Sequence, residues 1–142
     1  MRPHLLLVLG LIGCGASARI PARPAPVRLE ISAGKDTNHG GTLYVVVRKI
    51  DQAGFLAEDY DAIADRLFGE PADASVLRKA IVRPGAAVTV DAERPAADGE
   101  ILGVYFLFSM PGDDWRLAIV DPHIRRVKIV LGASGIVSAV QQ

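Results

Sequence analysis

The chain has 142 residues, a length that suits one domain with a single hydrophobic core. Its 16 basic and 16 acidic residues cancel, and the arginines are scattered along the sequence. This argues against a nucleic-acid partner and against electrostatic binding to a membrane surface, because both need a basic excess concentrated on one face. The single cysteine, Cys14, leaves no pair for an internal disulfide, so the fold must depend on packing.

The first residues have the arrangement of a bacterial lipoprotein signal. A short basic start precedes an apolar run over residues 5–12, which is too short to span a bilayer. Small Gly13 then precedes Cys14, so we expect residues 1–13 to be a signal peptide and Cys14 to become the acylated first residue. Gly15 follows where an aspartate would retain such a lipoprotein in the inner membrane, which favours the outer membrane. The alternative is an ordinary leader in which Cys14 is only a small apolar residue.

Residues 14–26 comprise the acylated cysteine and a predicted flexible tether. The twelve residues after Cys14 contain three prolines and no hydrophobic periodicity. In an extended conformation they would reach roughly 35–40 Å. Residues 27–142 are then expected to form the folded domain.

Strand and turn patterns alternate through this domain. Residues 27–32 alternate apolar and polar side chains, as in a half-buried strand, and residues 33–41 are polar and glycine-rich, which predicts an exposed loop. Residues 42–50 predict a central strand. The apolar stripe of Leu56, Tyr60, Ile63, Leu67 and Phe68 predicts a helix over about 57–68, ended by Gly69 and Pro71. Further strands are predicted at 76–82, 87–92, 100–109, 115–121, 125–131 and 136–140.

Seven or eight short strands with one inserted helix predict a mainly β protein, a β-sandwich. The run 101–108 is apolar on both faces and should be a central strand covered on both sides. The helical stripe should pack on the sandwich, although part of it could instead receive a partner. The expected core contains Leu29, Val45, Val47, Val104, Phe106, Leu117 and Ile119.

No catalytic or metal-binding constellation is recognisable in the sequence. His39 and His123 lack a catalytic neighbourhood, and residues 132–136 resemble a nucleophile elbow without its final glycine, which predicts a plain turn. Asp36, Asn38 and His39 are too few for a metal site. Helix carboxylates such as Asp59, Asp61 and Asp65 are expected to be solvated. We therefore expect no enzyme activity, no metal and no cofactor apart from the diacylglycerol and N-acyl (palmitate-type) chains on Cys14.

The order and spacing of several segments resemble the TssJ/VasD family, the outer-membrane lipoproteins of type VI secretion systems. The segments that carry the resemblance are the lipobox cysteine, residues 27–32, residues 43–50, the helical segment 55–68, Arg83-Pro84-Gly85, Leu102-Gly103-Val104 and Asp114-Trp115-Arg116. Together they cover nearly the whole mature chain.

This resemblance implies a transthyretin-like sandwich, lipid-anchored in the outer membrane and facing the periplasm. It implies a tether without catalysis that binds the periplasmic domain of the inner-membrane TssM-type protein, with no small-molecule substrate. In the family the loop between the first two strands contributes to partner binding. Here that position holds Lys35, Asp36, Thr37, Asn38, His39, Gly40 and Gly41.

Two other functions compete with this one. A generic periplasm-facing lipoprotein with a small-ligand-binding sandwich would need a concave apolar pocket with convergent polar groups. An envelope hydrolase would need acidic and hydroxyl groups clustered around His123.

Overall fold

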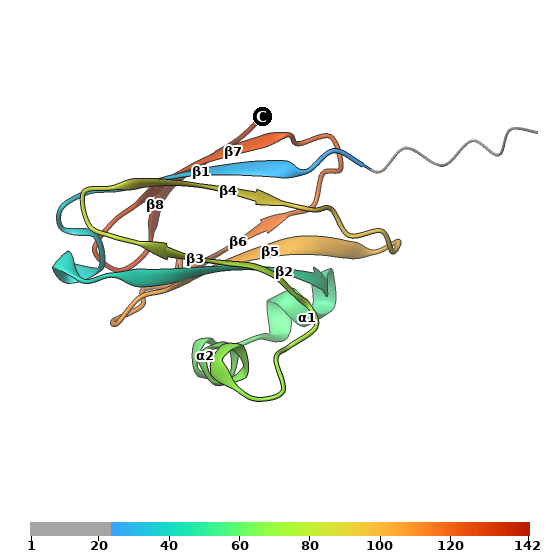
Figure 1. Ribbon diagram of the computed structural model, residues 1–142, viewed down its shortest axis with the longest axis horizontal. Helices are drawn as coiled ribbons and strands as arrows, with labels where there is room; N and C mark the ends of the chain where they lie inside the picture. The colour runs from blue at the N-terminus through green and yellow to red at the C-terminus, as the bar shows by residue number, and fades with distance from the viewer. Residues whose placement is uncertain (1–23) are drawn as a thin grey trace, which may run out of the picture.

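The computed structural model describes residues 24–142, in which two four-stranded sheets pack face to face (Figure 1). One sheet has the order β4-β1-β7-β8 and the other the order β3-β2-β5-β6. The strands are β1 (Val27–Ala33), β2 (Leu43–Asp51), β3 (Val76–Val82), β4 (Ala87–Ala92), β5 (Glu100–Leu107), β6 (Arg116–Ile119), β7 (Arg126–Leu131) and β8 (Ile136–Gln141). The predicted mainly β sandwich is confirmed.

Strand β1 organises the first sheet. It pairs antiparallel with β4 and parallel with β7, and its alternating side chains Val27, Leu29 and Ile31 are fully buried between the sheets. The opposite face of β1 carries Arg28 and Glu30, which form exposed or half-exposed ion pairs with neighbouring strands. The period-two pattern therefore sets which face of this sheet meets the core.

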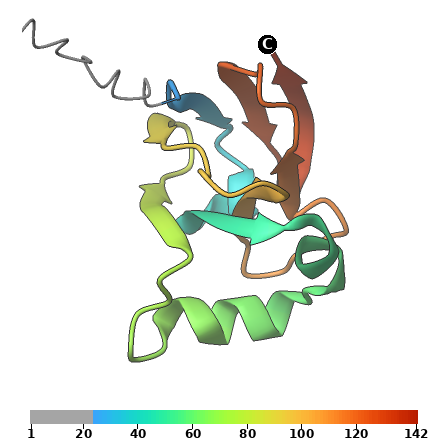
Figure 2. The same cartoon turned by 90° about the vertical axis from the view of Figure 1, so that its right-hand side faces the viewer.

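The second sheet is buried on both faces at its centre, as predicted for residues 101–108. Val45 and Val104 point toward the first sheet, while Val46 and Tyr105 occupy the opposite face, and all four are at most 1% exposed. Two helices cover that opposite face. They are α1 (Gln52–Ala57) and α2 (Tyr60–Phe68), and Figure 2 shows them on the side of this sheet that faces away from the first sheet.

The predicted helix over about 57–68 is confirmed from Tyr60 to Phe68, with its end at Gly69, but its predicted start is wrong. The chain leaves the helical conformation at Glu58 and Asp59, whose ψ angles are 135° and 164°. The Asp59 carboxylate caps α2 by accepting a hydrogen bond from the backbone N–H of Ala62 at 2.8 Å. Aspartate is a preferred residue at the position before a helix, because its carboxylate accepts a hydrogen bond from an N–H that the first helical turn leaves unpaired.

The break also changes the predicted apolar stripe. Ile63 and Leu67 are buried against the sheet, but Leu56 is 67% and Phe68 58% exposed. Leu56 belongs to α1, so its direction no longer follows the periodicity of α2. Of the expected core residues, Leu117 is only partly buried; the other six are buried.

Gly103 permits the packing under the helices. A Cβ atom at this position would lie 2.8 Å from Cε2 and the hydroxyl of Tyr105, whose ring folds back over the glycine. Arg48 is the cross-strand neighbour of Gly103 on β2. The missing side chain therefore leaves room on the sheet for a tyrosine and an arginine beneath the helices.

Candidate functional site

Four connections meet at one end of the sandwich, which we call the loop end. It comprises residues 34–42, 83–86, 108–115 and 132–135, and lies opposite Pro24, where the described chain leads into β1 (Figure 1). Backbone hydrogen bonds join the connections: Gly85 N–H donates to Gly34 O at 3.0 Å, and Gly112 N–H donates to Ser134 O at 2.6 Å. The loop end is therefore one continuous surface.

The predicted partner-binding loop folds into a tight 3₁₀ turn, Thr37–Gly40. Asn38 and His39 have φ angles of 51° and 54°, and Gly40 has a φ of 80°. Asparagine and glycine tolerate this left-handed region better than other residues. The Asn-His-Gly-Gly run was thus the signal in the sequence for a tight turn.

Most of this loop is exposed, as predicted, but two of its members point into the protein. Thr37 is 1% and Asn38 5% exposed. The Thr37 hydroxyl donates to Leu131 O at 3.0 Å. Asn38 Nδ2 donates to Thr42 O at 2.8 Å, and its Oδ1 accepts from the backbone N–H and the hydroxyl of Ser109 at 2.7 and 2.9 Å.

Asn38→Ala is expected to lower the free energy of unfolding by about 2–4 kcal/mol, because it leaves buried partners unsatisfied and places alanine in the left-handed region. Urea unfolding followed by Trp115 fluorescence measures this. His39→Ala is the matched control: it places alanine at nearly the same φ on an exposed residue, so it should show only the backbone cost and destabilise the protein less than Asn38→Ala. Equal effects of the two substitutions would contradict the structural role of the Asn38 amide.

The remaining predicted residues form the outer surface of the turn. Lys35, Asp36, His39 and Gly40 are exposed, and Gly41 is half-buried. Exposed residues of the 108–115 connection extend this surface, among them Met110 at 58% exposure. A turn held by hydrogen bonds that presents mixed charges and an apolar side chain is suited to binding another protein, because little order has to be imposed on binding.

A second polar cluster, which sequence reasoning missed, lies between the helices and the sheet. Arg48, only 4% exposed, donates through Nη1 to Glu58 Oε1 at 2.5 Å and through Nε to Ser75 Oγ at 2.9 Å. Its Nη2 lies 3.3 Å from Asp73 Oδ2. Glu58 lies in the segment predicted to be helical and outside its apolar stripe, yet its side chain is only 9% exposed.

Both carboxylate oxygens of Glu58 are used within this cluster. Oε2 accepts from the Tyr105 hydroxyl at 2.5 Å, and Oε1 also accepts from Arg66 Nη1 at 3.2 Å. Burial and the hydrogen bond to Glu58 raise the pKa of the Tyr105 phenol far above its ordinary value, so it remains a donor. Burial by itself raises the pKa of Asp73, but hydrogen bonds from Ser75 and the charge of Arg48 outweigh it and lower that pKa. The cluster therefore joins α1 and α2 to the sheet.

The catalytic and metal candidates do not come together. His39 lies at the loop end, whereas His123 lies in the β6–β7 connection at the Pro24 end, where its backbone N–H donates to Asp121 Oδ1 at 2.7 Å. Residues 132–135 connect two strands of a hairpin rather than a strand and a helix. Within residues 24–142 no three His, Cys, Asp or Glu side chains gather closely enough to hold a metal ion.

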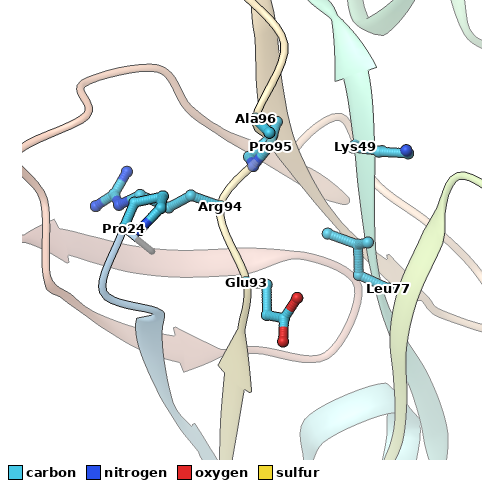
Figure 3. A pocket seen from close by; sticks show the side chains of 7 residues that line it. All are labelled: Pro24, Lys49, Leu77, Glu93, Arg94, Pro95 and Ala96. Atoms are coloured by element: carbon cyan, nitrogen blue, oxygen red, sulfur yellow. The ribbon is translucent and has the colours of Figure 1, made fainter. Parts of the chain in front are cut away.

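A surface cleft of about 220 Å³ lies at the Pro24 end (Figure 3). It is lined by Pro24, Lys49, Leu77, Glu93, Arg94, Pro95 and Ala96. Figure 3 shows the guanidinium of Arg94 beside Pro24, while the ammonium of Lys49 points away from it. A ligand site needs polar groups that converge on one point, and these two cations diverge. The cleft therefore does not favour a small-ligand carrier.

Cys14, the signal peptide and most of the predicted tether lie outside the described residues. The last tether residues, Pro24 to Pro26, are exposed, and β1 begins directly after them at Val27. None of the helices in residues 24–142 has the length and apolar character needed to cross a membrane.

Solved structures share this fold. The type VI secretion lipoprotein TssJ1 from Pseudomonas aeruginosa is 19% identical, with a TM-score of 0.64 over 84% of this chain and 97% of that one. Lip of Serratia marcescens, described as a membrane-bound component of the type VI secretion system, is 19% identical, with a TM-score of 0.60 over 84% and 98%. A chain in the structure described as the TssM C-terminal domain (869-1107) from EAEC is 20% identical, with a TM-score of 0.57 over 80% and 99%.

These similarities establish a fold shared with the TssJ lipoproteins, which confirms the resemblance indicated by the sequence. The comparison with curated proteins gave no significant match. The family described as the IglE N-terminal domain matches residues 44–131, from the second residue of β2 to the end of β7. This match spans more than half of the chain and includes the helices and the central strands of the second sheet. The chain therefore belongs to the IglE N-terminal domain family.

Proposed function

We propose that this protein is the lipid-anchored outer-membrane component of a type VI secretion membrane complex, where it tethers the periplasmic domain of a TssM-type inner-membrane protein. The role is structural and non-catalytic, and the acyl chains on Cys14 are its only attached group. The observation that carries the proposal is the family match to residues 44–131 in a chain with the TssJ fold.

The geometry of the sandwich supports this role. The chain enters β1 at Val27 and reaches the loop end after Ala33, so seven strand residues separate the two ends. At about 3.3 Å per residue, this is roughly 20 Å. A lipid on Cys14 would attach the domain to the membrane through its Pro24 end and leave the loop end, on the opposite side, free to meet a partner in the periplasm.

The descriptions of the similar solved structures support a TssM-type partner. A chain with this fold occurs in a structure described as the TssM C-terminal domain, and TssJ1 and Lip are themselves described as type VI secretion proteins. A pre-ordered turn at the loop end matches the requirements of a tether, which must hold its partner without rearranging. Anchoring also raises the effective concentration of the protein for a partner in the same envelope.

The test is binding of the detergent-solubilised intact lipoprotein to the purified periplasmic domain of the TssM-type protein from the same bacterium. We expect a saturable complex that weakens at least tenfold when Lys35, Asp36 and His39 are all replaced by alanine. These three residues are exposed, whereas shortening the whole loop would remove the buried side chains of Thr37 and Asn38.

The matched control replaces His123 and Arg125, which are exposed at the Pro24 end, by alanine. This variant should bind like the wild type. If the wild-type lipoprotein forms no complex with the TssM-type domain, the proposed function is wrong. If it binds and the triple variant binds equally well, the tether role stands and the contribution of the loop is refuted.

A further inference from the structure

Three apolar side chains are exposed together on the outer face of the second sheet, and we call them the outer patch: Tyr44 (42% exposed), Phe68 (58%) and Ile81 (53%). Tyr44 and Ile81 are direct cross-strand neighbours on β2 and β3. The rings of Tyr44 and Phe68 meet edge to face, with centroids 5.2 Å apart at 72°. A shallow cleft of about 370 Å³ lies here, lined by Tyr44, Lys79, Ala80 and Ile81.

The outer patch exists because the helices cover only part of this face. Helix α2 ends at Phe68, so the row formed by Tyr44 and Ile81 receives no helix above it. Farther along β2, Val46 and Arg48 are covered and almost fully buried. Exposed apolar side chains that form one contiguous group are a feature of protein-binding surfaces.

Two basic side chains, Lys79 and Arg83, flank the outer patch. The Lys79 ammonium lies 5.7 Å from the Phe68 ring centroid and donates to Leu67 O at 2.5 Å. An ammonium has three donors, so two remain for another acceptor. Arg83 follows β3 two residues after Ile81 and is exposed, and no hydrogen bond or ion pair engages its side chain within residues 24–142.

The outer patch also adjoins the loop end. Tyr44 comes two residues after Thr42, whose carbonyl receives the Asn38 amide, and Arg83 opens the 83–86 connection. The two surfaces are therefore adjacent, and a partner bound at the loop end can also contact Tyr44 and Ile81.

We propose that the outer patch is a second contact for the partner, and that it binds a segment with an apolar side chain flanked by carboxylates. The apolar side chain packs against Tyr44, Phe68 and Ile81, while the carboxylates pair with Lys79 and Arg83. Aromatic and arginine side chains at such a surface are the types that contribute most to binding. This inference rests on the proposed function, because it places the segment in the TssM-type periplasmic domain.

The test measures the affinity of the intact lipoprotein for that periplasmic domain in four variants. Ile81→Asp changes the outer patch, Arg83→Glu reverses a basic charge beside it, and each should weaken binding at least tenfold. Arg83→Glu should also reduce the dependence of the association rate on salt, because steering by opposite charge is screened by ions. The controls are Val137→Asp, 70% exposed on β8, and Arg125→Glu at the Pro24 end, and both should bind like the wild type.

Thermal unfolding of each variant verifies that the fold is intact, as expected for changes at exposed side chains. If the wild type binds and the outer-patch variants bind equally well, the outer patch is not a contact, while the tether function stands. A wild type that does not bind refutes both. The lipoprotein could instead self-associate in a concentration-dependent way. If Ile81→Asp abolished this self-association and left the affinity for the partner unchanged, the outer patch would be an interface between copies, and the proposal would be overturned.

Discussion

Glu58→Gln is expected to lower the free energy of unfolding by about 3 kcal/mol, because it removes the main counter-charge of a buried arginine while keeping the side-chain shape. Arg48 would then depend on Asp73, which lies farther away, at 3.3 Å instead of 2.5 Å. The glutamine amide would also lose the charge-assisted bond to the Tyr105 hydroxyl. Urea unfolding monitored by Trp115 fluorescence measures the change, since Trp115 is buried beside Tyr105.

Two further measurements test whether the effect of Glu58→Gln comes from the buried ion pair. Asp91→Asn breaks the Arg28 ion pair, whose side chains are about half exposed, and it should have little effect. In a double-mutant cycle, Arg48→Met combined with Glu58→Gln should cost less than the sum of the two single changes, because neither charge is then left alone. If Glu58→Gln were as mild as Asp91→Asn, the cluster would not be what joins the helices to the sheet.

Cys14→Ser is expected to move the protein from the membrane to the soluble fraction and to abolish secretion. The serine hydroxyl cannot form the thioether that carries the diacylglyceryl group, and each lost methylene removes about 0.8 kcal/mol of membrane burial. The folded domain begins at Val27, so its unfolding midpoint should not change. Fractionation of the envelope, with mass spectrometry of the mature amino terminus, tests both statements.

Gly15→Asp is the matched control for this experiment. It leaves Cys14 available for acylation, so the protein should stay membrane-bound but shift toward the inner membrane. A Cys14→Ser protein that still sediments with washed membranes would show that lipid on this residue is not the anchor. A wild-type protein whose Cys14 carries no acyl chain would likewise show that this residue is not the membrane anchor.

The candidate site was only half predictable from the sequence. The turn after β1 could be located from its glycines and polar residues, but Asn38 bonds to Ser109, which lies 71 residues away in the chain. Local composition describes an asparagine as polar and therefore exposed. Its burial depends on a backbone N–H that the fold delivers from the far end of β5.

The prediction of helix α2 was also limited by what local sequence patterns can show. The spacing of Ile63 and Leu67 correctly placed α2 on the sheet, because a helix must bury its apolar side. Neither the break at Glu58 nor its burial follows from that periodicity. Glu58 turns inward because Arg48, ten residues earlier, lies on the covered face of β2.

By itself, the sequence determined the strands and the character of the protein as a β-sandwich, because period-two alternation and turn residues act over only a few neighbouring positions. It also determined the motif around Cys14, on which the expectation of a lipid anchor rests. The tertiary structure alone decided that Thr37 and Asn38 close inward, that Arg48 and Glu58 meet in the interior, and that Tyr44, Phe68 and Ile81 share one exposed surface. Each of these depends on partners from distant segments, and only the packing of the whole chain brings such partners within contact distance.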